Sequence, residues 1–232
     1  MHLTAAELLQ YVTRLGIIFL ILPLHECAHA WAAHKLGDDT ASYQGRLTLN
    51  PLAHVDPMGA LLLLLTGFGW AKPVPIDPRK FSRKHSMRFG VAITALAGPL
   101  SNLLAALVGM IFFQFFMLSD LFQEYCQVYE SNPNVMTSGA IIYIILYYFI
   151  MINIGLCVFN LIPIPPLDGS KILSYFTSGR FDRWLRQNQM IISIVFMVLI
   201  FTSLLSVPLS YLSTWVFNGL EFITRWIPAV FG

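Results

Sequence analysis

The sequence predicts an all-α polytopic membrane protein, with about five transmembrane helices and a short β or re-entrant loop region between the first two. Two observations carry this prediction. Of the 232 residues, 56% are hydrophobic and only 11% are charged, whereas soluble domains carry about 25% charged residues. Several apolar segments also reach the roughly 20 residues that a helix needs to cross a bilayer. The mean hydropathy of +0.67 agrees with both observations.

The first apolar segment, from about Ala5 to Ala33, contains the motif His25-Glu26-Cys27-Ala28-His29. Positions i and i+4 share one face of a helix, so the two imidazoles can bind one metal ion together. Glu26 follows the first imidazole, and its carboxylate can reach a metal-bound water. Ionisable side chains inside an apolar span are costly, and they indicate a functional site. The motif therefore predicts a zinc hydrolase site within the membrane.

Residues 38–80 are predicted to form strands, turns and a loop that dips into the membrane. The apolar run from Met58 to Trp70 is too short to span comfortably and is typical of a re-entrant segment. The prolines between Lys72 and Pro78 exclude a helix there. Non-helical backbone at membrane depth is tolerated only against protein or water. We therefore expect this region to form a wall of the active-site cavity.

Four further transmembrane helices are predicted downstream. They run from about Phe89 to Leu118, Ser138 to Leu161, Met190 to Val207 and Leu209 to Phe231. The last is the weakest, because Glu221 and Arg225 interrupt it. These two residues are an i,i+4 pair, so they either neutralise each other or lie in the interface.

The charges of the loops predict the orientation in the cell membrane. Lys and Arg gather in residues 71–88 and 163–187, and residues 119–137 contain neither. The positive-inside rule places the first and second of these loops in the cytoplasm and 119–137 outside. His25 then lies roughly 15 Å, and Asn102 roughly 20 Å, from the cytoplasmic ends of their helices, at 1.5 Å per residue. We expect an active site toward the cytoplasmic side.

Two histidines do not complete a catalytic zinc site, which usually has three protein ligands and a water. The best third ligand in the sequence is Asp168, near the cytoplasmic end of the third predicted helix. Three prolines between Pro163 and Pro166 break the helix before it. A carboxylate beside so apolar a stretch needs a partner, which zinc would provide. A simple helix cap is the alternative role for Asp168.

Taken together, these motifs resemble the site-2 protease family of intramembrane zinc metalloproteases, in its compact prokaryotic form. The resemblance covers most of residues 20–175. Its three main matches are His25 to His29, Gly98-Pro99-Leu100-Ser101-Asn102, and Asn160 to Asp168-Gly169. Supporting matches are Leu36-Gly37-Asp38, Gly45 to Pro51 and His54 to Pro57. No PDZ-like or nucleotide-binding domain is recognised.

The resemblance implies the roles of the site residues. The zinc ligands, for one ion per chain, would be His25, His29 and Asp168. Glu26 would be the catalytic base. Asn102 and Asn160 would be polar groups near the site, and Asn160 would hold the substrate carbonyl or oxyanion. A transmembrane protein segment would be the substrate, unwound and held extended by strand addition to residues 38–80.

The domain prediction is a single membrane-embedded protease domain over residues 1–232. Its catalytic core would cover about 5–175, and its C-terminal helices about 188–231. The net charge of +2 argues against nucleic acid as a partner. The three scattered cysteines, Cys27, Cys126 and Cys157, show no disulfide framework. The sequence leaves the oligomeric state open.

Several alternatives remain at this stage. Asn102 is equally consistent with a helix–helix hydrogen bond, and Asn160 with pairing to carbonyls freed by the prolines. His54 and Asp56 are more consistent with shaping the cavity or contacting substrate than with binding metal. A membrane metal transporter or sensor would also need intramembrane His and Asp residues. The internal repeats typical of transporters are not detected in the sequence. A relative that binds membrane segments without cleaving them is the other alternative.

Overall fold

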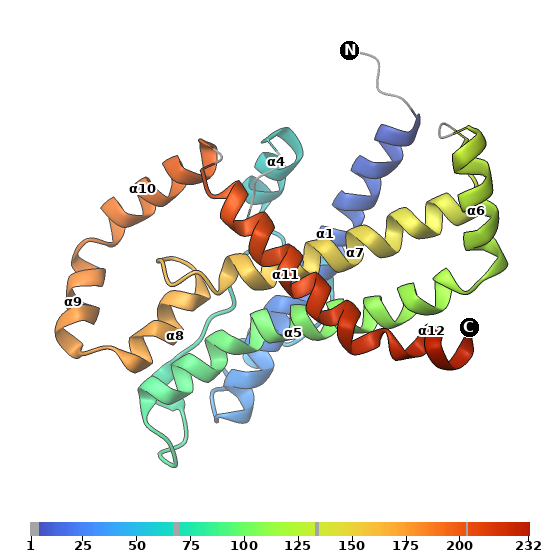
Figure 1. Ribbon diagram of the computed structural model, residues 1–232. Coiled ribbons are helices and arrows are strands. Elements are labelled where there is room, and N and C mark those ends of the chain that lie inside the picture. Colours follow the sequence, from blue (N-terminus) through green and yellow to red (C-terminus); the bar gives the residue numbers. More distant parts are fainter. Residues whose placement is uncertain (1–4, 67–69, 133–134, 203) are drawn as a thin grey trace.

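Three long helices form the centre of the molecule. The computed structural model describes residues 5–66, 70–132, 135–202 and 204–232. In Figure 1, α1 (Ala5–Lys35) crosses α5 (Met87–Met117) and α7 (Ser138–Asn160), which run roughly alongside each other. From Tyr11 onward α1 is long and apolar enough to cross a membrane, and so are α5 and α7. The prediction of an all-α protein with several helices able to cross a membrane is therefore confirmed.

Local signals fix where the long helices begin. The Ser86 hydroxyl accepts a hydrogen bond from the backbone N–H of Phe89 at the start of α5. The Thr137 hydroxyl accepts one from the backbone N–H of Ala140, 3.1 Å away, at the start of α7. Each cap satisfies a donor that would otherwise be left without a partner at a helix N-terminus.

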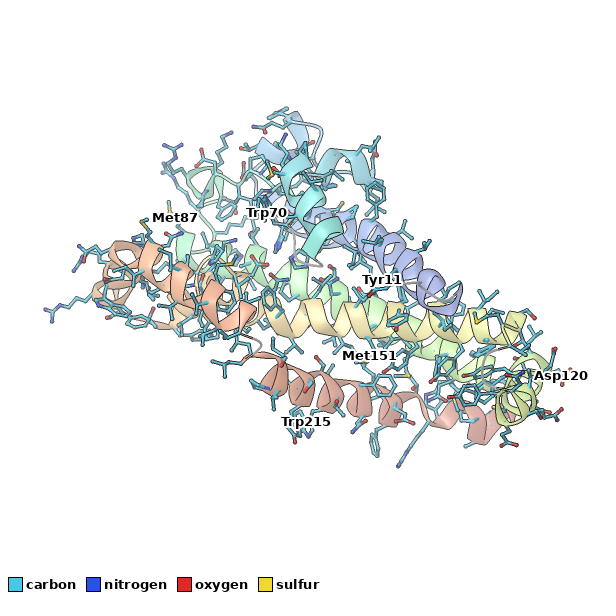
Figure 2. All side chains as sticks on the ribbon, turned by 90° about the horizontal axis from the view of Figure 1, so that it is seen from above. Tyr11, Trp70, Met87, Asp120, Met151 and Trp215 are labelled. Atoms are coloured by element: carbon cyan, nitrogen blue, oxygen red, sulfur yellow. The ribbon has the colours of Figure 1, made fainter. Side chains whose placement is uncertain are left out.

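The main apolar core lies where α5, α7 and α11 (Ser206–Thr224) meet. Its fully or almost fully buried members are Ala106, Met110, Ile150, Ile154 and Leu220. Seen from above in Figure 2, α11 with Trp215 lies on one side of α5 and α7. On the opposite side lie α4 (Pro57–Thr66) and, just beyond it, Trp70. Of these, α11 packs against both α5 and α7 and covers one face of the pair.

Shorter helices gather at the two ends of this centre (Figure 1). At one end are α8 (Asp168–Phe176), α9 (Gly179–Gln187) and α10 (Gln189–Phe201); at the other are α6 (Asp120–Ser131) and α12 (Trp226–Phe231). Arg88, near the start of α5, forms an ion pair with the buried Asp182 of α9 and donates to the carbonyl of Thr177. These contacts fasten the α8–α9 connection to the first turn of α5.

The predicted strands between the first two long helices are not confirmed in the described residues. This region contains α2 (Thr40–Tyr43), α3 (Pro51–His54), α4 and the 3₁₀ turn η1 (Pro78–Lys80). The β pairing is a single antiparallel bridge between Val55 and Ala71. Asn50 caps α3 by accepting from the N–H of Leu52, and Pro51 follows as its first residue, so this stretch starts a helix. Residues 67–69 lie outside the described part.

The count of five transmembrane helices is not confirmed either. The predicted fourth span ends early, because α10 has 13 residues and reaches about 20 Å at 1.5 Å per residue, short of a roughly 30 Å hydrocarbon core. The predicted fifth span is divided at Arg225 into α11 and α12. Among the described residues no ion pair joins Arg225 to Glu221; its guanidinium lies over the Phe222 ring, 4.0 Å from the centroid.

Candidate metal centre

Three side chains from two distant parts of the chain meet in the interior. The Nε2 atom of His25 lies 3.2 Å from Asp168 Oδ2, and the Nε2 atom of His29 lies 3.0 Å from the same oxygen. The two Nε2 atoms are 3.0 Å apart. All three side chains are buried. The trio is the group of potential metal ligands found among the described residues, and it is the set predicted from the sequence.

The back of each imidazole is held by an acceptor. The Nδ1 atom of His25 lies 2.5 Å from Asn102 Oδ1, and that of His29 lies 2.7 Å from the Thr94 carbonyl oxygen. Since these oxygens only accept, each Nδ1 carries the proton and each Nε2 turns a lone pair to the centre. This is the usual second contact of a metal-binding histidine.

The front of the trio therefore presents three acceptors to one point. Two nitrogen lone pairs and a carboxylate oxygen at 3.0–3.2 Å repel one another unless a cation lies between them. Tetrahedral zinc, with bonds of about 2.0–2.2 Å, keeps neighbouring ligand atoms about 3.3 Å apart. The observed spacing is close to that value. The donor set, two imidazoles and one carboxylate with a position left open, is that of a catalytic zinc site.

Gly98 allows α5 to approach this centre. A Cβ atom at Gly98 would overlap Nε2 and Cε1 of His29 and Nε2 of His25. The helix backbone thus packs directly against the imidazole edges. This is the steric reason for a glycine in the Gly98-Pro99-Leu100-Ser101-Asn102 stretch.

Asp168 reaches the imidazoles because α7 ends eight residues earlier. After Asn160 the chain turns through the prolines, with Leu167 N–H donating to the Ile164 carbonyl, and α8 begins at Asp168 itself. Gly169 closes this turn, because a Cβ there would overlap the carbonyl oxygens of Leu161 and Ile162. The tight turn, and not the helix, aims the carboxylate inward.

The charge of Asp168 is also stabilised. Burial raises the pKa of Asp168, whereas the ammonium of the nearby Lys171 lowers it. Lys171 Nζ lies 3.0 Å from Asp168 Oδ1, one helical turn further along α8. The ammonium binds one carboxylate oxygen, and Oδ2 faces the same point as the two Nε2 atoms. A carboxyl paired with an ammonium is favoured in its ionised form, which is the form that binds a metal.

Glu26 lies beside the trio and is held by the extended segment 71–77. Its Oε2 accepts a hydrogen bond from the backbone N–H of Val74, 3.1 Å away. The Val74 side chain is buried against Ala30 and Ala41, which turns its N–H toward α1. Because Pro73 and Pro75 have no N–H, Val74 provides the one backbone donor of this tripeptide, and Glu26 receives it.

The three potential metal ligands and Glu26 line one cavity of about 830 Å³. Segment 70–78, α5, α7, α8 and α10 form its walls; α10 contributes Ser193, Phe196 and Met197. Asn160 also lines it, and its Nδ2 donates to the Leu156 carbonyl 2.9 Å away. Asn102 does not line it: this fully buried amide lies behind His25.

His54 and Asp56 lie apart from the trio. The Nε2 atom of His54 pairs with the Thr48 carbonyl oxygen at 2.8 Å. Asp56 Oδ1 accepts from the N–H of Gly59 at the start of α4. Neither residue lines the cavity. Both contacts shape the loop around α3 and α4.

Four contributors to the site were not identified from the sequence: the Thr94 carbonyl, the Val74 N–H, Lys171 and Asn153. The first two are backbone groups, so no side-chain pattern reveals them. Lys171 stands at i+3 from Asp168, a spacing typical of a helical ion pair. Asn153 Oδ1 accepts from Asn102 Nδ2 at 3.0 Å; an amide in the apolar run Met151-Ile152-Asn153-Ile154 is the signal that identifies it.

Comparison with known proteins agrees with this site. The model of peptidase family M50, the site-2 protease family, matches residues 13–204. Two relatives bear the name "Putative zinc metalloprotease". YwhC of Bacillus subtilis is 38% identical over 78% of this chain and 76% of its own. Rip2 of Mycolicibacterium smegmatis is 26% identical over 92% of this chain and 79% of its own.

No solved structure matches the chain. The family match covers the HExxH motif, the glycine that adjoins it and the aspartate that completes the trio. A membrane zinc metalloprotease requires a buried pair of imidazoles and a carboxylate; here the imidazoles lie on a helix able to cross a membrane, and the carboxylate lies at the start of α8. The chain therefore belongs to peptidase family M50, the site-2 protease family.

Proposed function

We propose that the protein is an intramembrane zinc metalloprotease that hydrolyses peptide bonds of transmembrane or membrane-associated protein segments. One observation carries the proposal: the three metal donors and the carboxylate of Glu26 face one cavity among helices long enough to cross a membrane. The volume of about 830 Å³ falls within the range of ligand-binding pockets. A short extended stretch of peptide fits such a space.

His25, His29 and Asp168 hold the zinc ion in this proposal. When bound, zinc supplies Lewis acidity, which polarises a carbonyl and makes water a stronger acid. Glu26 accepts the proton of the attacking water and later delivers it to the leaving amine. The Val74 N–H keeps the Glu26 carboxylate beside the trio while it does so.

Asn160 is the proposed donor to the substrate carbonyl and to the oxyanion that forms from it. Its amide has two N–H bonds. One donates to the Leu156 carbonyl, which fixes the side chain, and the other is available to a group in the cavity. A fixed donor in a cavity with mostly apolar walls stabilises developing negative charge more than water does.

The substrate must enter unwound, because a helix uses its own carbonyls in backbone hydrogen bonds. We propose that the extended segment 71–77 faces the substrate across the cavity, and that the cavity opens toward the cytoplasm. The segment is already extended, and Arg46 holds it by donating to the Lys72 and Pro73 carbonyls. Basic residues in 71–88 and 163–187 support the orientation.

The test compares the wild type with Glu26→Gln on single-span membrane peptides, with products identified by mass spectrometry. Glu26→Gln should retain zinc and lose about 10²- to 10⁴-fold in cleavage rate, the range for removal of a general base. A chelator should abolish wild-type cleavage, and added zinc should restore it. Continued cleavage by Glu26→Gln would refute the assignment of the base. Zinc flux into proteoliposomes without any cleavage would support a transporter instead.

A further inference from the structure

A chain of three hydrogen bonds runs from the metal ligand His25 into the wall of α7. It passes from His25 Nδ1 to Asn102 Oδ1 (2.5 Å), from Asn102 Nδ2 to Asn153 Oδ1 (3.0 Å), and from Asn153 Nδ2 to the Phe149 carbonyl (2.9 Å). Both asparagines are fully buried. Asn153 does not line the cavity and does not contact the metal ligands, so it has no direct role in the proposed reaction.

The direction of this chain is fixed at its far end. The Phe149 carbonyl can only accept, so Asn153 must turn its Nδ2 toward it. The Oδ1 of Asn153 then faces Asn102, so Asn102 must donate a hydrogen bond to it through Nδ2. Asn102 is left with Oδ1 toward His25, so Nδ1 of that imidazole must donate. The opposite orientation of Asn153 would place two acceptor oxygens face to face in an apolar interior, which is costly.

We propose that Asn153 is a positioning residue for the metal centre: through Asn102 it fixes the His25 tautomer whose Nε2 lone pair faces the metal. An amide can present either its oxygen or its nitrogen, so Asn102 alone does not define this tautomer. A carboxylate, the common partner of metal-binding histidines, needs no such orientation because both of its oxygens accept. Asn153 supplies the orientation that a neutral amide lacks.

The inference rests on the metal site of the proposed function, and metal affinity is its readout. Zinc dissociation constants are measured by competition with a chromophoric chelator on purified protein in lipid nanodiscs. Asn153→Leu replaces the amide oxygen and the amide nitrogen by methyl groups and keeps the branched shape of the side chain. It should weaken zinc binding about 10- to 100-fold, the range for loss of an outer partner of a metal ligand. If Asn153→Leu does not fold, Asn153→Ala carries the same expectation.

Gln114→Leu is the matched control. Gln114 is a buried amide on α5 whose Nε2 donates to Thr224 Oγ1, 3.3 Å away. It has no contact with the metal ligands. Both variants lose one buried hydrogen-bonding amide between packed helices, so a purely structural effect would appear in both. Gln114→Leu should keep the wild-type zinc affinity.

A double-mutant cycle tests the direction of the chain itself. In an Asn102→Asp background, His25 Nδ1 faces a carboxylate that accepts in either orientation. Asn153→Leu should then cause no further loss of zinc affinity, whereas it causes the full loss when Asn102 is present. Equal losses in the two backgrounds would overturn the proposal, and so would wild-type affinity in Asn153→Leu itself. Failure of the wild type to bind zinc would instead refute the metal site.

Discussion

At the residue scale, the metal centre depends on a position that has no side chain. Gly98 lets the backbone of α5 lie against both imidazoles, and any Cβ there would overlap their ring atoms. The interior around it cannot yield easily, because Nδ1 of each imidazole is tied to α5, at Asn102 and at Thr94. An added methyl group must therefore displace an imidazole from the trio.

We expect Gly98→Ala to reduce zinc affinity by about tenfold or more, comparable to the loss of an outer partner of a metal ligand. Zinc content after dialysis at a buffered zinc concentration is the measurement. Gly155→Ala on α7 is the control, because a Cβ at that position meets nothing within 4 Å. If the two alanine variants retain the same zinc, the close packing of α5 against the imidazoles is not what shapes the site.

At the element scale, segment 71–77 acts through its backbone. It is held at three places: by the Val55–Ala71 bridge, by Arg46 on the Lys72 and Pro73 carbonyls, and by the Asp77 N–H on the Asp38 carboxylate at 2.6 Å. These anchors leave little freedom to the residues between them. The N–H of Val74 is thereby delivered to Glu26 as a fixed donor.

Val74→Pro removes this donor and keeps an extended backbone. A hydrogen bond to a charged group contributes about 1.5–3 kcal/mol, so the cleavage rate should fall about tenfold to a hundredfold. Zinc content should be unchanged, because Glu26 is not one of the three ligands. The assay is kcat on a single-span peptide.

Val74→Ala is the companion variant. It loses packing against Ala30 and Ala41 but retains the N–H, so its kcat should stay nearer to that of the wild type. If Val74→Ala loses as much activity as Val74→Pro, side-chain packing and not the backbone donor explains the effect.

At the scale of the whole molecule, we expect α1, α5 and α7 to alternate in direction across the bilayer, because each contains a segment long and apolar enough to cross it. The loop before α5 is rich in Lys and Arg, and α6, which follows α5, carries Asp120, Glu124 and Glu130. The positive-inside rule then assigns the loop to the cytoplasm and α6 to the outside. The metal centre lies on the cytoplasmic half of α1 in this orientation.

Single cysteines introduced by Lys84→Cys and Glu124→Cys test this arrangement in a chain whose three native cysteines are replaced by alanine. Both positions are exposed. A membrane-impermeant thiol reagent should label Glu124→Cys in intact cells and Lys84→Cys only after permeabilisation. The reverse labelling pattern would show that the protein has the opposite orientation in the membrane. Labelling of both from one side would contradict a crossing by α5.

The prediction of the fold succeeded where the composition of a single segment is enough to identify a membrane-spanning helix. The runs that became α5 and α7 are apolar over more than a bilayer thickness, so composition alone identifies them. It was not confirmed where a helix cap or a break in the helix overrides the broader pattern. Residues 43–51 mix β-forming and turn residues, but Asn50 caps a helix that Pro51 begins. The run 190–207 is apolar throughout, yet the structure ends α10 at Phe201 and begins α11 at Ser206.

The sequence by itself predicted the set of possible metal donors. Two histidines four residues apart share a helix face whatever surrounds them, and the proline-rich turn indicated Asp168 as the third candidate ligand. Only the tertiary structure decided what holds these ligands in place. The Thr94 carbonyl, the Val74 N–H and the chain from Asn102 through Asn153 act across helices distant in sequence. Spacing reports only contacts within one helix, whereas hydrogen bonds between helices depend on how the helices pack.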